Sequence, residues 1–153
     1  MGLAFAPAET QSAKIVHREH FMKVLVIEDD PSISAFLEKG LREAGFAVDV
    51  AANGVGGEQL ARNGAYDVVL LDLMLPQKSG LSVLRSLRDR GQHVPVICLT
   101  AKDTVHDRVA GLEAGARTTI SSNHSQSRNF WRAFVLSYSG ACLSRIPHSA
   151  FAI

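Results

Sequence analysis

Short apolar runs alternate with amphipathic stretches through the middle of the chain. Three runs, residues 24–30 (VLVIEDD), 68–72 (VVLLD) and 96–100 (VICLT), end on acidic or hydroxyl residues. Uninterrupted apolar runs of this length are typical of strands in a parallel sheet that is covered on both faces. Ligands bind such sheets at the carboxyl ends of the strands. We therefore expect Glu28, Asp29, Asp72 and Thr100 to meet at one site.

The segments between these runs predict the remaining elements. Asp30 and Pro31 are typical of a helix start, and the apolar residues that follow recur at helical spacing until Gly45. The predicted order is strand 24–27, helix 31–44, strand 47–51, helix 54–63, strand 68–72, loop 73–80, a helix from 81, strand 96–100 and a helix through Val105, Val109 and Leu112. The pattern places Leu81, Leu84 and Leu87 inward and Arg85 and Arg88 in solvent, and Gly115 ends the last helix. This alternation predicts an α/β fold.

Composition narrows the class of protein. The 153 residues are 46% hydrophobic and 20% charged, which suits one globular domain. A net charge of +1 favours neither nucleic acid nor a membrane as partner. Cys98 and Cys142 form no disulfide or metal pattern, so we expect a cytoplasmic protein. Residues 1–21 lack the features of a signal peptide and are interpreted as a disordered N-terminal extension before Met22.

The acidic residues predict a metal site. Carboxylates held together at strand ends repel one another unless a cation such as magnesium lies between them. Asp29, Asp72 and a backbone carbonyl just after Asp72 would supply oxygen ligands, and Asp72 could then attack phosphorus. Thr100 could hydrogen-bond a phosphoryl oxygen.

Structural interpretations compete with this one. For Asp30 alone we prefer a helix N-cap. Taken singly, Asp72 could be a loop acid and Thr100 a strand-end hydroxyl, whereas the conjunction of acids favours function. The helix arginines are interpreted as solvated surface, and Met74 and Cys98 as packing residues.

Four segments carry a family resemblance: residues 24–31 (VLVIEDDP), 67–80 (DVVLLDLMLPQKSG), 94–101 (VPVICLTA) and 111–116 (GLEAGA). Together they resemble a response-regulator receiver domain of the OmpR-like subfamily, over residues 22–116. The resemblance implies a flavodoxin-like (CheY-like) doubly wound parallel sheet with strand order 2-1-3-4-5. It also implies a phosphoacceptor in a two-component phosphorelay, which is an enzyme at most in phosphorylating and dephosphorylating itself.

The resemblance implies a role for each candidate residue. Asp72 would accept a phosphoryl group from a sensor histidine kinase, and Thr100 would be the switch hydroxyl. Asp29, Asp72 and the Met74 backbone carbonyl would bind Mg²⁺, and Glu28 would act on it through water.

The chain departs from the family after residue 116. Residues 117–153 contain no Asp, Glu or Lys, and they carry an aromatic cluster. The family has a fifth strand with an aromatic switch residue and a Lys-Pro pair, then a fifth helix that often forms a dimer face. We expect this strand and helix to be altered or missing, the edge of the fourth strand to be unpaired, and Leu70, Val96 and Ile97 to lose cover. Marginal stability, impaired switching and a weakened homodimer would follow.

A frameshift would explain this departure. Back-translated from Arg117, the chain can yield DDYLVKPF in another frame, and residues 126–132 can yield VAELLAR. We therefore interpret residues 117–153 as a frameshifted tail. An alternative function is the remnant of a DNA-binding transcriptional regulator that lacks its output domain, with no direct DNA binding by this chain.

Two enzyme-class alternatives are disfavoured by the residues of the site. In a flavin-binding protein, the acids at 28–30 would repel phosphate. An aspartyl phosphatase would need an Asp-x-Asp motif, but Asp72 is followed by Leu73 and Met74.

Overall fold

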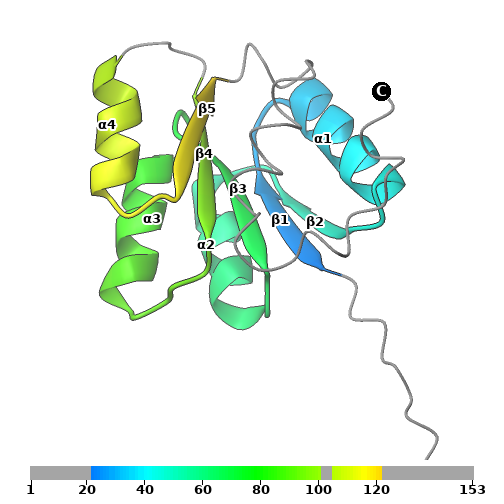
Figure 1. Cartoon of the computed structure of the whole chain (residues 1–153), viewed down its shortest axis with the longest axis horizontal. Coiled ribbons are helices and arrows are strands. Elements are labelled where there is room, and N and C mark those ends of the chain that lie inside the picture. Colours follow the sequence, from blue (N-terminus) through cyan, green and yellow to red (C-terminus); the bar gives the residue numbers. More distant parts are fainter. Residues whose placement is uncertain (1–21, 101–104, 122–153) are drawn as a thin grey trace, which may run out of the picture.

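The structure of the protein, a computed structural model, describes residues 22–100 and 105–121. Within these ranges a parallel sheet has the strand order β2-β1-β3-β4-β5 (Figure 1). The elements are β1 (Lys23–Ile27), α1 (Pro31–Glu43), β2 (Ala47–Ala51), α2 (Gly54–Asn63), β3 (Val68–Asp72), α3 (Gly80–Asp89), β4 (Val96–Thr100), α4 (Val105–Glu113) and β5 (Thr118–Ser121). The predicted doubly wound α/β fold and its strand order are confirmed.

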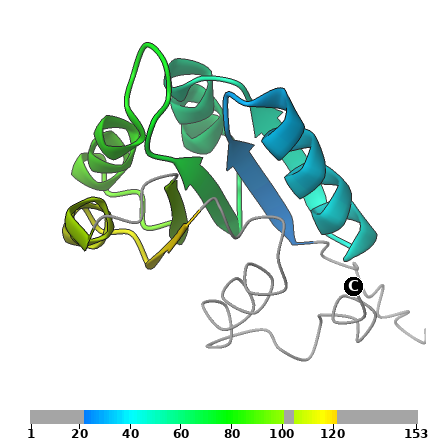
Figure 2. The same cartoon turned by 90° about the horizontal axis from the view of Figure 1, so that it is seen from above.

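Side chains of the central strands alternate between two hydrophobic cores. On one face, the β1 residues Val24 and Val26 pack with Leu37 and Leu41 of α1. On the other face, Leu25 and Ile27 share a core with buried residues of α2 and α3. Figure 2 shows α1 on one side of the sheet and α2 and α3 on the other. Because both faces are covered, the central strands are apolar between their ends, as their sequence indicated.

Helix α1 follows β1 directly because Asp30 caps it. The Asp30 Oδ1 accepts hydrogen bonds from the backbone N–H groups of Ser32, at 2.7 Å, and Ile33, at 3.2 Å. Pro31 is the first helical residue, and Gly45 follows the helix with a φ of 87°. The N-cap interpretation of Asp30 is confirmed. This short connection places Glu28 and Asp29 at the edge of the sheet where the strands end.

The expected unpaired edge on β4 is not present. β5 pairs with β4 in parallel, with Ile97 opposite Thr118, and the N–H of Arg117 donates to the Val96 carbonyl at 2.7 Å. The strand is altered in sequence but formed, because backbone pairing needs no particular side chain and Thr118, Thr119 and Ile120 are β-branched.

The prediction that residues of the third and fourth strands would be uncovered is also wrong. Leu70, Val96 and Ile97 are fully buried. The predictions for the fifth helix, the dimer face, residues 1–21 and residues 122–153 concern parts of the chain outside the described residues.

Helix α3 corrects one surface assignment. Arg88 does not point into solvent: its guanidinium donates to the carbonyls of Gln92 (2.7 Å), Val94 (3.0 Å) and Gly115 (2.9 Å). The Gly115 contact ties the turn after α4 to α3. Sequence periodicity placed Arg88 correctly on the helix but could not predict the carbonyls that its long side chain reaches.

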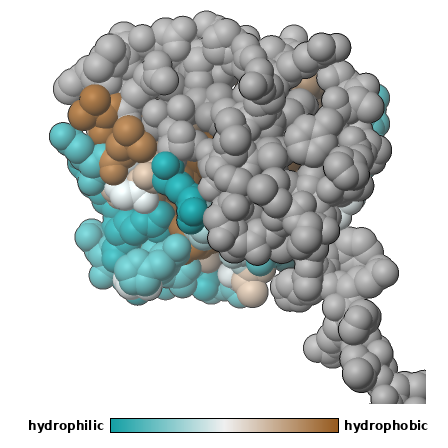
Figure 3. All heavy atoms as spheres, in the orientation of Figure 1, coloured by the Kyte–Doolittle hydropathy of each residue, from teal (hydrophilic) through white to brown (hydrophobic). Residues whose placement is uncertain are grey.

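The surface of α4 is partly apolar. Val109 and Leu112 are 42% and 49% exposed, so this helix does not bury all of the face that its spacing predicted. Figure 3 shows hydrophobic side chains on the α4 side of this view and hydrophilic ones on the α3 side. Among the described residues, no helix is long and apolar enough to cross a membrane.

Candidate functional site

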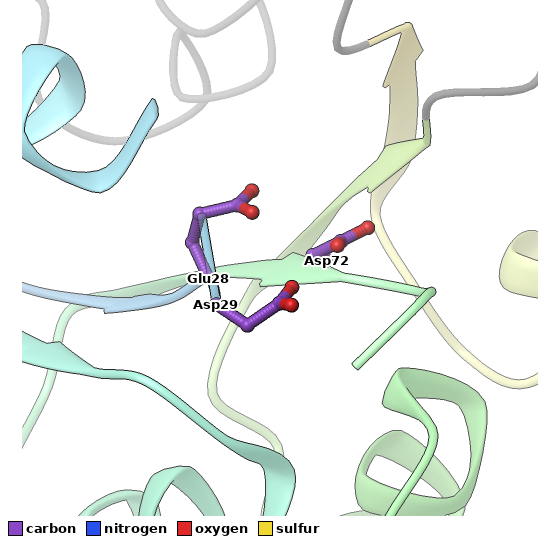
Figure 4. A group of neighbouring side chains, drawn as sticks. All are labelled: Glu28, Asp29 and Asp72. Carbon is purple, nitrogen blue, oxygen red and sulfur yellow. The ribbon is translucent and has the colours of Figure 1, made fainter. Parts of the chain in front are cut away.

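Three carboxylates meet where the two central strands end. Glu28 and Asp29 follow β1, and Asp72 is the last residue of the neighbouring β3. Ile27 pairs with Leu71, so Glu28 and Asp72 each follow one partner of the same pair. Ligand oxygens of the three side chains all lie within 4.8 Å of one another (Figure 4). The sequence prediction that these acids converge is therefore confirmed.

Two of the three carboxylates are buried. Glu28 is 3% exposed and Asp72 is 8% exposed, whereas Asp29 faces solvent. Burial raises the pKa of Glu28 from its ordinary value of 4.5 to about 7, and the charges of Asp72 and Asp29 add to this effect. Burial and the charge of Asp29 also raise the pKa of Asp72. No basic side chain is among the charges that shift these two pKa values in the described part of the chain.

Backbone N–H groups orient the two buried carboxylates. The Asp30 N–H donates to Glu28 Oε1 at 3.1 Å, and the Met74 N–H donates to Asp72 Oδ1 at 3.1 Å. The first of these lowers the pKa of Glu28 and opposes the effect of burial. Both carboxylates are thus held by the loops that follow their strands.

The loop after β3 folds back tightly on Asp72. The Gly80 N–H donates to the Leu73 carbonyl at 3.2 Å, and a Cβ at position 80 would overlap the Asp72 carbonyl oxygen. Position 80 therefore requires glycine for close backbone approach. This closure keeps the Met74 backbone beside Asp72.

The other residues that were considered for the site are Thr100, Met74 and Cys98, and the structure places each of them differently. Thr100 is the last residue of β4 and pairs with Ser121, but its side chain lies outside what the structure describes. Met74 is 59% exposed, so the packing interpretation of its side chain is wrong. Cys98 is fully buried on β4, as a packing residue should be.

One polar contact near the site was not predicted. Glu58 of α2 forms an ion pair with Lys78 of the loop after β3 and accepts a hydrogen bond from the Ser86 hydroxyl at 2.6 Å. These residues are separated by 20 and 28 positions in the sequence. No periodicity or motif links positions so far apart, so the contact depends on the packing of α2 against α3.

The cluster fits a hard divalent cation. Its donors are carboxylate oxygens, which magnesium prefers. Among residues 22–100 and 105–121, no basic side chain is a cause of the pKa shifts of its two buried acids. Burial and the mutual repulsion of the acids raise these two pKa values, and a bound cation would stabilise the charged carboxylates against both effects. The three acids, with the Met74 backbone nearby, are thus suited to hold Mg²⁺.

The comparison with protein families decides the classification. The model of the response regulator receiver domain matches residues 24–128. The chain belongs to this family. As a receiver domain it is a component of two-component signalling and a phosphoacceptor rather than an enzyme in the ordinary sense, and receiver domains partner with sensor histidine kinases.

Relatives of this receiver domain are transcriptional regulators. The probable transcriptional regulatory protein SilR of Salmonella typhimurium is 50% identical over 95 residues, which cover 62% of this chain and 42% of SilR. The transcriptional regulatory protein CusR of Escherichia coli (strain K12) is 47% identical, with the same coverage. The chain thus spans about two fifths of the length of these relatives.

Solved receiver domains have the same architecture. The receiver domain of the Francisella response regulator 1452 is 31% identical, has a TM-score of 0.70, and covers 77% of this chain and 98% of its own. The receiver domain of the sensor histidine kinase PA1611 of Pseudomonas aeruginosa PAO1 is 29% identical, with a TM-score of 0.69 and coverage of 79% and 99%. That structure contains a magnesium ion in its active site cleft.

Proposed function

We propose that this receiver domain accepts a phosphoryl group on Asp72 from a sensor histidine kinase in the presence of Mg²⁺. The observation that carries the proposal is the carboxylate cluster: its oxygens lie within 4.8 Å of one another, two of its acids are buried, and no basic side chain of the described residues is among the causes of their raised pKa values. The magnesium ion in the cleft of the PA1611 receiver supports the choice of metal. Asp29, Asp72 and the Met74 carbonyl would hold the ion, and Glu28 would act on it through water.

In this reaction an Asp72 carboxylate oxygen forms a bond to phosphorus while the bond from phosphorus to the kinase imidazole nitrogen breaks. The electron pair of the broken bond stays on the imidazole, which then takes a proton from solvent. The Met74 N–H holds Asp72 Oδ1 and so orients the carboxylate. Magnesium, when bound, neutralises charge on the carboxylates and the phosphoryl oxygens, which otherwise repel.

The switching step is proposed to be impaired. The Thr100 hydroxyl at the end of β4 is the group that would respond to a phosphoryl oxygen. The lysine that follows the fifth strand in the family would ion-pair the acyl phosphate, but the last lysine of this chain is Lys102. Without that ion pair, the acyl phosphate is coupled less strongly to the Thr100 hydroxyl.

Labelling with a small phosphodonor tests the acceptor. With Mg²⁺ and acetyl phosphate, intact mass spectrometry should show one added phosphoryl group, and Asp72→Asn should abolish it because an amide is not a competent nucleophile. Asp89→Asn, an exposed acid at the end of α3, is the matched control and should label like wild type. Equal labelling of the Asp72 variant would show that another residue is the nucleophile.

The wider context is proposed from the relatives. Their names describe transcriptional regulators, and the matched segment is 42% of their length, so the ancestral protein carried a DNA-binding output domain beyond the receiver. We take residues 22–116 as the receiver sequence, residues 1–21 as an extension, and residues 117–153 as a frameshifted tail that weakens a homodimer. The first residues of this tail still form β5 of the receiver sheet. The chain acts in the cytoplasm and does not itself bind DNA or a membrane.

Resequencing the gene across the codons for residues 115–124 tests the frameshift: a continuous DDYLVKPF frame would make the tail an artefact.

A further inference from the structure

Glu58 joins three elements, one of which is the loop that follows Asp72. It lies on α2, is 9% exposed, and contacts Lys78 from the loop after β3 and Ser86 from α3. The ion pair with Lys78, and then the Ser86 hydrogen bond, lower the pKa of the Glu58 carboxyl, so this side chain is ionised at neutral pH. A partly buried charge pair of this kind restrains the groups that it joins more than an exposed pair does.

Lys78 is also held through its backbone. The first residue of α2, Gly54, approaches so closely that a Cβ there would overlap the Lys78 carbonyl oxygen. The Lys78 N–H donates to the Pro76 carbonyl at 2.7 Å, which completes a turn around Gln77 at a φ of 66°. Helix α2 therefore fixes this limb of the loop by a side-chain contact and a backbone contact at one residue.

Met74 lies on the other limb of the same loop, and its own side chain adds little restraint. Leu73 and Leu75 are 7% and 8% exposed and anchor the backbone on either side, but the Met74 side chain is 59% exposed. The position of the Met74 peptide thus depends on the rest of the loop, which is anchored at Leu73, Leu75, Lys78 and Gly80.

We propose that Glu58, through its ion pair with Lys78, is a positioning residue that holds the loop after β3 so that the Met74 carbonyl stays in place for Mg²⁺. This inference rests on the proposed function, because it assigns a second layer of support to the same metal site. Groups that orient metal ligands affect metal affinity without touching the ion.

The decisive variant is Lys78→Gln, because positioning and long-range charge predict opposite signs. Removal of a positive charge near a cation site should tighten Mg²⁺ binding by Coulomb's law. Positioning predicts the reverse: Mg²⁺ affinity, measured by isothermal titration calorimetry well below the melting temperature, should fall about threefold or more. Tighter or unchanged binding by this variant would overturn the inference.

A double-mutant cycle tests the pair itself. Glu58→Gln should weaken Mg²⁺ binding by a similar factor, and the double variant should bind no more weakly than either single one, because the same contact is lost each time. Fully additive effects would contradict a shared role. Glu43→Gln removes a distant, weakly paired acid at the end of α1 and should leave the affinity unchanged.

Asp72→Asn separates this inference from the proposed function. If Asp72→Asn binds Mg²⁺ as wild type does, the metal site itself is wrongly placed and the proposed function fails. If Asp72→Asn weakens binding while Lys78→Gln does not, the metal site stands and the positioning role of Glu58 is refuted.

Discussion

Burial raises the pKa of Glu28 more strongly than any single neighbouring charge does. The desolvation of its carboxyl is the largest cause of its raised pKa, and the Asp30 N–H opposes that cause. Glu28 directly follows β1, and Asp30 in the same short connection is the N-cap of α1. The site therefore holds an acid that is partly protonated near neutral pH until a cation arrives.

This raised pKa makes the stability of the metal-free protein depend on pH. Between pH 4.5 and about 7, folded Glu28 keeps a proton that the unfolded chain has released, so its contribution to the free energy of unfolding falls as pH rises. The difference between the two pKa values corresponds to at most about 3 kcal/mol. The stability of wild type relative to Glu28→Gln should decrease across this range in urea unfolding with a chelator present.

Asp72, whose pKa is also raised, acts in the same direction in both proteins, so the difference between them reports Glu28 together with its coupling to Asp72. Saturating Mg²⁺ should flatten the dependence, since a cation favours the ionised carboxyl. A wild-type-to-variant difference that stays constant with pH would show that Glu28 titrates normally in the folded protein.

At the scale of elements, α2 lies close to β1 because glycine faces the sheet. Gly57 is buried, and a Cβ there would lie 2.6 Å from side-chain carbons of Ile27, which is itself fully buried. The N–H of Gly56, one residue earlier, donates to Asn53 Oδ1 at 2.8 Å, and a Cβ at position 56 would come no closer than 3.4 Å to any atom of the Asn53 side chain. The two adjacent glycines thus have different reasons to be present.

Alanine at these two positions should have opposite effects. Gly57→Ala forces α2 away from Ile27 and should lower the free energy of unfolding by about 1–3 kcal/mol. Gly56→Ala meets no obstacle and should be neutral or stabilising by up to about 1 kcal/mol, because alanine favours the helix. Thermal melts of both variants provide the measurement, and equal losses would show that α2 does not pack as described.

At the scale of the whole molecule, β5 closes one edge of β4. The pairing runs from Ile97 with Thr118 to Thr100 with Ser121, and Arg88 ties the Gly115 turn that precedes β5 to α3. The residues of this strand differ from those of the family, yet they complete the sheet. The stability of the protein then depends on an edge built mostly from Thr and Ser, with Ile120 as the one large apolar residue of β5.

Proline substitutions in β5 should show how much this strand contributes to the stability of the protein. Replacing both Thr119 and Ile120 by proline removes two adjacent N–H groups, whichever of them faces β4, and should destabilise the protein by about 2 kcal/mol or more. The same positions changed to valine keep the β-branched shape and should melt near wild type. The proline variant should also bind a hydrophobic dye. A proline variant as stable as wild type would show that β5 contributes nothing to the fold.

The amino-acid sequence by itself determined the elements from β1 to α4 and the meeting of the acids, and the resemblance to receiver domains implied the order of the strands. Apolar runs specify buried strands and helical spacing specifies the helices. Because parallel strands end at the same edge of the sheet, the acids after β1 and at the end of β3 had to meet. The elements and the acid cluster depend on local pattern, which a single chain displays directly.

Only the tertiary structure decided the rest. The pKa of Glu28 depends on how completely water is excluded, the Glu58–Lys78 pair on the packing of α2 against α3, and the Arg88 contacts on where three carbonyls lie. β5 forms because β4 offers backbone partners, although its residue types alone indicated an altered or missing strand. Such contacts join residues far apart in sequence, and their energies depend on distance and burial, which exist only once the chain has folded.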